Sequence, residues 1–357
     1  MRRRNLCSPS NDEIRKILIE RIDSQHQSIG IVVGIIEPSG SRMISYGTFA
    51  KDDKHPVDGD TVFEIGSITK VFTSLILADM VQRGEVALSD PIAKYLPSEV
   101  KVPERDGRQI TLEDLSTHTS GLPRMPDNFK PADPDNPYAD YTVEQLYNFL
   151  SNYTLTRDIG SQFEYSNLGG GLLGHVLARR AGIDYEALVR SRILAPLKMS
   201  DTTIKLTPAM QTRLATGHNA SMSPVKNWDS ATLAGAGALR STANDMLRFL
   251  AANLGYIDSP QAPAMATMLR ERRSTGPMPL GNLKMEVGLA WMITTRSNSQ
   301  AVWQQRRSSG TTAAEEATGR SSLLIPRDAS VSRCYPMPEQ RQAWTISRCT
   351  CLIPTFR

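Results

Sequence analysis

The chain begins with the pattern of an amphipathic helix and two strands. Residues 11–23 place four aliphatic side chains at spacings of three and four, which gathers them on one helix face: Ile14, Ile17, Leu18 and Ile22. Residues 31–36 form a run of β-branched side chains that only Gly34 interrupts. A Pro-Ser-Gly turn at 38–40 precedes a second predicted strand over 42–47.

A longer helix is predicted from Ser67 to Arg83. Apolar residues cover nearly every face of this segment, and Gly84 ends it. A helix that is apolar all round is normally buried in a core. We therefore expect this helix at the centre of the molecule, with Ser67 at its N-terminal end.

The middle of the chain, residues 85–235, alternates short helices with loops rich in proline and glycine. Three helices are predicted here from apolar spacing and capping residues: 143–150, 168–180 and 185–195. A strand pattern returns at 285–293. This order predicts a discontinuous α/β domain (11–84 and 236–300) with an all-helical domain (85–235) inserted into it.

Composition and charge narrow the class of protein. Hydrophobic residues make up 40% and charged residues 22% of the 357 residues, which is typical of a globular protein, and no apolar run is long enough for a membrane span. Residues 301–357 contain eight arginines, no lysine and four acidic residues, so they carry the whole net charge of +4. The remainder is neutral, which does not indicate binding to nucleic acid.

No metal or cofactor is indicated. Three of the four cysteines lie in the last 24 residues, and the five histidines form no ligand cluster. Residues 1–10 contain three arginines with no apolar run behind them, so as written they do not form a complete secretory signal. Localisation stays open on this basis.

The spacing Ser-x-x-Lys occurs three times, and its context separates the three: Ser67–Lys70, Ser98–Lys101 and Ser223–Lys226. Prolines flank the second and interrupt the third, so only the first opens a buried helix. Residues three apart share a helix face, which puts Lys70 beside Ser67. Burial favours a neutral, basic lysine that can take the serine proton, and the helix N-terminus favours an oxyanion.

A plainer interpretation of this motif is that Ser67 merely begins a core helix and Lys70 extends to solvent. Tyr165-Ser166-Asn167, just before the 168–180 helix, weighs against it. Tyr165 can relay a proton between nucleophile and leaving group, and Asn167 can bind both the lysine and a substrate amide. Read alone, this tripeptide is also ordinary turn chemistry.

Four segments, taken together and in this order, resemble the class C β-lactamase family, which includes D-alanyl-D-alanine carboxypeptidases and related carboxylesterases. They are F-E-I-G-S-I-T-K at 63–70, L-S-T-H-T-S-G-L at 115–122, Y-S-N at 165–167 and L-R-S-T at 239–242. The resemblance implies a β-lactamase/transpeptidase-like fold, an antiparallel sheet flanked by helices plus a helical domain.

For the chemistry, the resemblance implies Ser67 as the nucleophile, Lys70 and Tyr165 as the general-base pair, and Asn167 as a substrate contact. His118 is expected to hold structure rather than do chemistry. The expected partners are small acyl substrates: β-lactams, D-Ala-D-Ala peptides or small esters, with Tyr-Ser-Asn favouring amides and lactams. The alternatives are a non-catalytic penicillin-binding homologue and, more distantly, a nucleic-acid binder that uses the arginine-rich tail.

The family's third motif, a strand with Lys or His and a glycine two residues later, should follow Gly288-Leu289-Ala290-Trp291. Nothing in residues 301–357 fits it. Permitted codons for residues 309–322, read from the last base of each codon, spell W-H-N-G-G-R-G-G-Y-R-S-F-F, which resembles that motif. Residues 329–346 likewise give V-G-V-A-V-L-S-N-A-G-T-A-A-G-V-D-D, which resembles the following strand and helix.

We predict that the tail is the product of a frameshift and forms a disordered segment. The chain is then expected to be poorly folded, because the sheet loses its active-site edge, or weakly active, because one oxyanion donor is lost. Resequencing of the coding DNA is expected to reveal an insertion or deletion near Arg306–Gly310. An unshifted reading through these codons would refute the prediction, and so would chromogenic-ester turnover equal to that of a frame-corrected chain.

Overall fold

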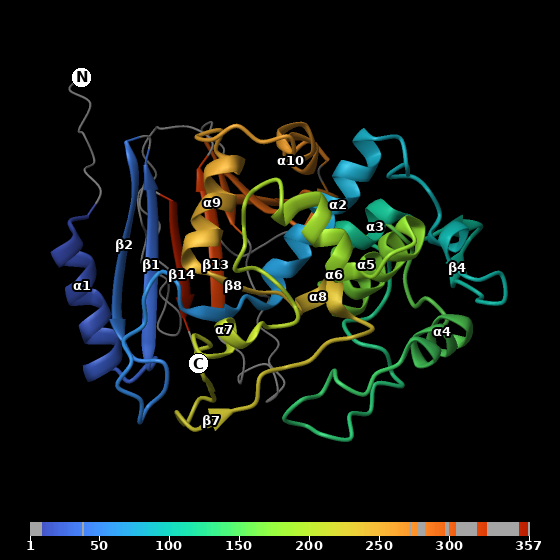
Figure 1. Cartoon of the computed structure of the whole chain (residues 1–357). Helices are drawn as coiled ribbons and strands as arrows, with labels where there is room; N and C mark the ends of the chain where they lie inside the picture. Colours follow the sequence, from blue (N-terminus) through green and yellow to red (C-terminus); the bar gives the residue numbers. More distant parts are fainter. Residues whose placement is uncertain are drawn as a thin grey trace.

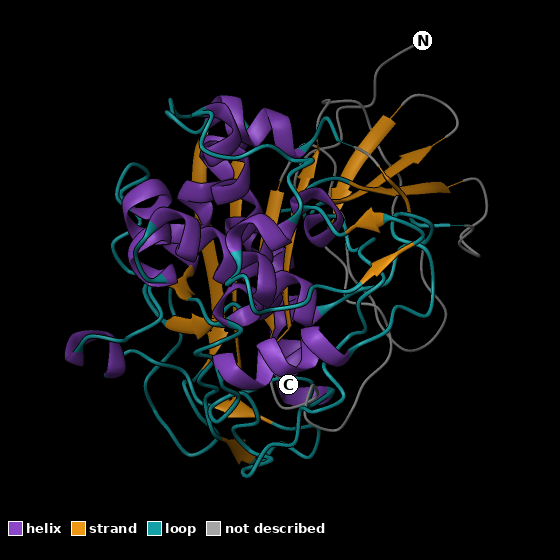
Figure 2. Cartoon of the chain, turned by 90° about the vertical axis from the view of Figure 1, so that its right-hand side faces the viewer, coloured by secondary structure: helices purple, strands orange, loops and turns teal. Residues whose placement is uncertain are grey.

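The computed structural model describes residues 9–37, 39–271, 273–276, 283–296, 300–304, 320–326 and 350–355. A sheet lies at one side of the molecule and a group of helices at the other (Figure 1). In the view turned by 90°, most of the helices stand in front of the strands (Figure 2). This mixed architecture agrees with the predicted fold class.

The sheet has eight strands in the order β2-β1-β14-β13-β12-β11-β10-β9, and each neighbouring pair is antiparallel. Its strands are β1 (Gly30–Glu37), β2 (Gly40–Gly47), β9 (Arg273–Ser274), β10 (Leu283–Val287), β11 (Met292–Arg296), β12 (Gln300–Gln304), β13 (Arg320–Pro326) and β14 (Thr350–Thr355). The first strand in the sequence therefore pairs with the last.

Three further pairs of strands lie outside this sheet. They are β3 (Val62–Glu64) with β8 (Arg240–Thr242), β4 (Glu104–Arg105) with β5 (Arg108–Gln109), and β6 (Gly217–His218) with β7 (Pro224–Val225). The β3–β8 pair joins the segment before Ser67 to a segment far along the chain, so it sets where the nucleophile region begins.

The α-helices are α1 (Asn11–Ile19), α2 (Thr69–Gln82), α3 (Leu112–Ser116), α4 (Val143–Asn152), α5 (Asn167–Ala181), α6 (Tyr185–Val189), α7 (Pro208–Gln211), α8 (Ala234–Gly237), α9 (Ala243–Asn253) and α10 (Ala262–Met268). Short 3-10 segments are η2 (Gly66–Ile68) and η3 (Ile92–Tyr95), and π-helical turns are η1 (Glu20–Ser24) and η4 (Arg190–Leu194). In the described part of the chain, no helix has both the length and the apolar character that crossing a membrane requires.

Strand β1 is buried on both faces, which explains its continuous β-branched run. Ile31, Val33 and Ile35 cluster with residues of α1, whereas Val32 and Ile36 belong to the main core on the opposite face. α1 and α9 therefore cover opposite faces of this part of the sheet (Figure 1).

Gly34 allows the close approach of α9 to β1. A Cβ atom at this position would lie 2.8 Å from Cγ of Leu247 in α9. The glycine that interrupts the β-branched run is therefore a packing requirement and not a break in the strand.

The centre of the main core is α2, as predicted. All but two of its fourteen residues are buried, including Phe72, whose ring stacks on Phe249 of α9 at a centroid distance of 4.5 Å. The capping box of Thr142 and Gln145 forms with both of its hydrogen bonds. The division into sheet and helical domains at 84/85 and 235/236 remains a prediction, since the main core contains residues from both parts.

One expectation needs correction. The single strand predicted at 285–293 is a hairpin of β10 and β11, because Gly288 to Trp291 form a tight turn in which Gly288 N donates to Trp291 O at 2.7 Å.

The predicted disorder of residues 301–357 stays a prediction. Within this tail the structure describes most of β12 together with β13 and β14, whose Leu-Leu-Ile and Cys-Leu-Ile runs are typical of strands. The remainder of the tail lies outside the described residues.

We expect Gly34→Val to lower the free energy of unfolding by about 1–3 kcal/mol, because the added side chain overlaps Leu247. Urea denaturation followed by circular dichroism measures the change. The double variant Gly34→Val/Leu247→Ala is expected to recover part of the loss. A double variant less stable than the sum of the two single effects would contradict the proposed overlap.

Candidate active site

The backbone around Ser67 is set by the glycine before it. Gly66 has φ +50°, and no atom lies within 4 Å of where its Cβ would be, so conformation and not crowding favours glycine there. The chain leaves β3, turns at Gly66 and enters η2, which continues into α2. Ser67 thus stands at the N-terminal end of the core helix, where the helix dipole favours negative charge.

Lys70 is buried within one turn of Ser67. Its side chain Nζ donates hydrogen bonds to Ser67 Oγ at 3.1 Å, Asn167 Oδ1 at 2.9 Å and the Ala236 carbonyl at 2.7 Å. Three acceptors match the three N–H groups of an ammonium, and hydrogen bonds to the charged form favour it. We expected burial to favour a neutral lysine; the acceptors around Lys70 oppose that effect.

Tyr165 lies on the other side of the nucleophile. Its hydroxyl donates to Ser67 Oγ at 2.5 Å. The Lys70 Nζ lies 4.8 Å and the Arg124 Cζ 5.2 Å from the centre of the Tyr165 ring. The three residues expected to carry the chemistry, Ser67, Lys70 and Tyr165, therefore meet at one point, and Ser67 Oγ contacts both of the others.

The His118 ring packs against the ring of Tyr165. The two rings are 4.7 Å apart at a tilt of 33°, and His118 Nδ1 accepts the backbone N–H of Ser166 at 3.2 Å. Burial, with the nearby charges of Lys70 and Arg124, lowers the pKa of His118 to about 3. A neutral imidazole keeps the lone pair that the Ser166 N–H needs, so His118 orients the Tyr165 segment.

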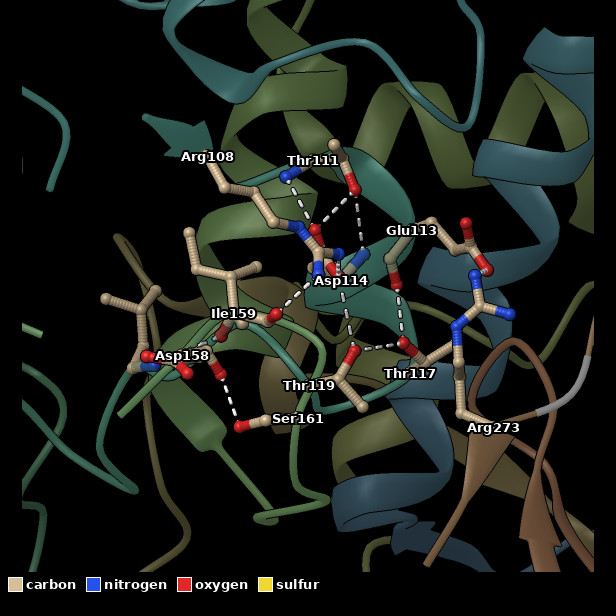
Figure 3. A network of polar contacts seen from close by, with 12 residues as sticks. Arg108, Thr111, Glu113, Asp114, Thr117, Thr119, Asp158, Ile159, Ser161 and Arg273 are labelled. Atoms are coloured by element: carbon tan, nitrogen blue, oxygen red, sulfur yellow. Dashed lines mark hydrogen bonds and ion pairs between the residues drawn. The ribbon is translucent and has the colours of Figure 1, made fainter. Parts of the chain in front are cut away.

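A polar network fixes the loop that carries His118 (Figure 3). Asp114 accepts the N–H and hydroxyl of Thr111 at 3.1 and 2.7 Å and the Arg108 guanidinium at 3.0 Å. The Thr119 backbone N–H donates to the Asp114 carbonyl at 2.9 Å. These bonds hold both sides of His118, which itself has a left-handed φ of +59°.

Asn167 is the first residue of α5, and this helix passes close to Lys70. Its side-chain oxygen accepts from Lys70, and its Nδ2 donates to the Tyr138 hydroxyl at 3.3 Å. A Cβ on Gly170, one turn further, would lie 3.0 Å from Lys70 Cε. The glycine-rich start of α5 therefore leaves the space that the lysine side chain occupies.

A cavity of about 50 Å³ opens beside the nucleophile. It is lined by Glu64, Gly66, Ser67, Tyr138, Asn167, Trp228, Ser230, Leu233, Ala236 and Gly237. The Tyr138 and Trp228 rings lie 5.3 Å apart and give one wall an aromatic character.

Two loops that meet over this cavity were not anticipated from the sequence. Asn136 and Asp229 exchange two hydrogen bonds, of 3.0 and 2.8 Å. The Lys226 ammonium pairs with Asp133 at 2.8 Å. We call residues 131–141 and 224–233 the roof loops. No local sequence pattern predicts these pairs, because their members are more than ninety residues apart.

The buried pair of Glu64 and Arg240 was also missed, although both residues lie in the segments that carry the family resemblance. Glu64 Oε1 accepts the Trp228 N–H at 2.8 Å and the Arg240 guanidinium at 3.3 Å. Arg240 donates to the Trp228 carbonyl at 2.8 Å as well. Burial raises the pKa of Glu64. The pair fastens one roof loop to β3, next to Ser67.

The other Ser-x-x-Lys pairs do not resemble this arrangement. Ser98 is exposed, and Lys226 is occupied by the roof-loop pair with Asp133. Among the residues that the structure describes, no group of three or more His, Cys, Asp or Glu side chains is placed to hold a metal ion.

The position of the third motif is partly described. β13 runs beside η2, so a strand from the tail borders the nucleophile. Its sequence, Arg-Ser-Ser-Leu-Leu-Ile-Pro, lacks a Lys or His with a glycine two residues on. Residues 305–319, where the shifted reading gives the motif, lie outside the described residues.

Sequence comparisons place the chain among known proteins. The family model described as Beta-lactamase matches residues 15–319. A D-alanyl-D-alanine-carboxypeptidase/endopeptidase, AmpH, from Escherichia coli K12 is 35% identical over 246 residues, 68% of this chain and 63% of AmpH. A beta-lactamase from the same organism is 31% identical over 250 residues, 70% of this chain and 62% of that protein. The matched part thus spans less than two thirds of these relatives.

Solved structures share the fold. A class C beta lactamase from Rhodobacter sphaeroides has a TM-score of 0.73 at 22% identity, covering 96% of this chain and 93% of that one. A beta-lactamase/D-alanine carboxypeptidase from Yersinia pestis, complexed with citrate, also has a TM-score of 0.73, at 24% identity, covering 97% and 92%.

We expect Gly170→Ala to slow covalent labelling of Ser67 by a fluorophosphonate about 10- to 100-fold, because the new methyl group displaces the Lys70 side chain. Labelling rates, measured on protein of unchanged melting temperature, test this. Gly169→Ala is the matched control: it adds the same group one residue earlier, where Ser166 and not Lys70 is the neighbour. Equal rates for the two variants would contradict the prediction.

Proposed function

The chain belongs to the beta-lactamase family, and from this membership we propose that it is a serine hydrolase that forms an acyl-enzyme on Ser67. The observation that carries the proposal is the contact of one hydroxyl, Ser67 Oγ, with both Tyr165 Oη at 2.5 Å and Lys70 Nζ at 3.1 Å. This is the geometry of an activated nucleophile with its base in hydrogen-bond reach.

Acylation uses Tyr165 as the base and Lys70 as the fixed positive charge. With its phenol ionised, Tyr165 accepts the proton of Ser67 while Oγ attacks the substrate carbonyl. The Lys70 ammonium stabilises the negative charge on Oγ, and the N-terminus of the core helix faces the developing oxyanion. The carbonyl–nitrogen bond then breaks, and the leaving amine takes the proton from Tyr165.

Deacylation repeats these steps with water. Tyr165 accepts a proton from the water that attacks the acyl carbonyl, and Ser67 Oγ leaves and regains a proton from Tyr165. The side-chain oxygen of Asn167 accepts a hydrogen bond from Lys70, and its amide N–H₂ donates to the Tyr138 hydroxyl. A substrate carbonyl replaces this hydroxyl as the acceptor when the substrate binds.

We place amide-type substrates first, namely D-Ala-D-Ala peptides and β-lactams, ahead of small esters. Two features support this order: the Tyr165-Ser166-Asn167 arrangement, with an amide-binding group beside the nucleophile, and the 35% identity to a D-alanyl-D-alanine-carboxypeptidase/endopeptidase. The motifs alone do not distinguish a peptidase from a lactamase, since both present a carbonyl to the same serine.

A second candidate is a penicillin-binding homologue that acylates but does not turn over. It is favoured by the sequence of β13, which borders η2 without the Lys or His and glycine of the third motif. Loss of one oxyanion donor lowers the rate by roughly 10²–10³ in other serine hydrolases. Slow release of the acyl group is what this candidate predicts.

The expected result is a penicillin adduct on Ser67. Intact-protein mass spectrometry after incubation with a fluorescent penicillin measures it, and peptide mapping locates it. The adduct should be absent from Ser67→Ala and present in Ser98→Ala, which removes the serine of another Ser-x-x-Lys pair.

The lifetime of the adduct separates the two candidates. Loss within minutes indicates a hydrolase, whereas persistence over hours indicates the acylating homologue. An adduct that survives in Ser67→Ala, or no adduct with penicillin and with a D-Ala-D-Ala thioester alike, would contradict the proposed nucleophile.

A further inference from the structure

The ring of Tyr165 lies near two cations and one neutral base. Lys70 Nζ is 4.8 Å and Arg124 Cζ 5.2 Å from the ring centre, and both therefore fall within the range of a cation–π contact. The third neighbour, His118, has a pKa of about 3 and adds no charge at neutral pH. The proposed mechanism uses the charge of Lys70 and leaves Arg124 without a role.

We propose that Arg124 is a positioning residue for the general base: its guanidinium, over the Tyr165 ring, favours the ionised phenol that accepts the proton of Ser67. The inference rests on the proposed function, in which Tyr165 is the base. A phenolate spreads its negative charge into the ring, so a cation at the ring interacts with the phenolate more strongly than with the phenol.

The backbone holds Arg124 in this place. Its carbonyl accepts the N–H of Asn167 at 3.0 Å and that of Leu168 at 3.1 Å. These are the first two residues of α5, whose N-terminal N–H groups need acceptors outside the helix. The backbone of Arg124 is therefore anchored to the N-terminal end of α5. This end carries Asn167 and lies two residues after Tyr165. The backbone from which the guanidinium extends is consequently a fixed part of the site.

The charged groups around Tyr165 come from several elements. α2 contributes Lys70, the loop after α3 contributes His118, and the loop after Leu122 contributes Arg124. Next to Tyr165 in sequence, Glu164 forms an ion pair with Arg157. Across the cavity, Glu64 is paired with Arg240. Both of these carboxyl groups lie beside an arginine of their own, and Lys70 and Arg124 lie within cation–π range of the ring.

The sign of the effect follows from the charges. A nearby cation favours the anionic phenolate, so the phenol ionises at lower pH with Arg124 than without it. Removal of the guanidinium charge moves the ionisation to higher pH and leaves less of the base form at neutral pH. Acylation then slows at neutral pH and recovers as the pH rises.

The decisive measurement is the ionisation of Tyr165 itself. Ultraviolet titration of the tyrosinate band, taken as the difference between the full chain and its Tyr165→Phe variant, isolates this residue without any substrate. In the Arg124→Gln background, which keeps a planar amide but removes the charge, the midpoint is expected to rise by about one pH unit, a tenfold change in the ionisation equilibrium. Arg124→Lys, which keeps the charge, should shift it much less.

A second variant controls for loss of charge in general. Arg105→Gln removes an arginine of β4 that pairs with Asp158, and it should leave the Tyr165 midpoint unchanged. Two results would overturn the inference, because neither follows from the charge of the guanidinium. One is a Tyr165 ionisation midpoint that is unchanged in Arg124→Gln. The other is a midpoint that moves equally in Arg124→Lys and Arg124→Gln.

The pH dependence of acylation gives the functional counterpart. The acidic limb of the rate of Ser67 labelling should move upward in Arg124→Gln by the same amount as the spectroscopic midpoint, so that the rate falls about tenfold at neutral pH. A shifted midpoint in a chain that penicillin and the thioester do not acylate would refute the proposed function alone. Acylation of Ser67 with an unshifted midpoint would refute the role of Arg124 alone.

Discussion

The buried side-chain amine of Lys70 is the group on which the rest of the site depends. A polar group in the core is tolerated only when its hydrogen bonds are met. Here the acceptors come from three separate segments: Ser67 in η2, Asn167 at the start of α5 and the carbonyl of Ala236 in α8. The hydrogen bonds of this one side chain therefore connect α2, α5 and α8 beside the nucleophile. The glycines of α5 and α8 allow these helices to pack closely enough for the hydrogen bonds to form.

Much of the fold follows from local pattern. The β-branched run of β1, the apolar faces of α2 and the capping residue Thr142 each indicated the element that forms. The candidate site was equally accessible, because Ser67, Lys70, Tyr165 and Asn167 lie in short segments whose spacing has chemical meaning. What the pattern could not give was the set of acceptors around Lys70. Burial alone favours a neutral amine, and the Asn167 and Ala236 acceptors, supplied by tertiary structure, oppose that effect.

The features that the sequence did not reveal are contacts between distant segments. Glu64 and Arg240 form a buried pair across 176 positions, and Asn136 meets Asp229 across 93. Neither pair has a spacing that a helix or hairpin would impose, so no local rule identifies it. The hairpin turn at Gly288–Trp291 was missed for a related reason. Its residues are apolar and buried, like those of a strand, and the turn also depends on hydrogen bonds to the distant carbonyls of Ser116 and Met268.

The roof loops meet each other through side chains, while the nucleophile and its base are held by the core helices. Ser67, Lys70 and Tyr165 make none of the bonds that join Asn136 to Asp229 or Lys226 to Asp133. The contacts between the roof loops are thus made by side chains other than the nucleophile and its base, although Tyr138 and Trp228 link the roof to Asn167 and Glu64. Mutations at the contacts between the two loops can alter the roof without removing a hydrogen bond of the proton-transfer residues, so selection for a new acyl group has a route open to it that spares catalysis.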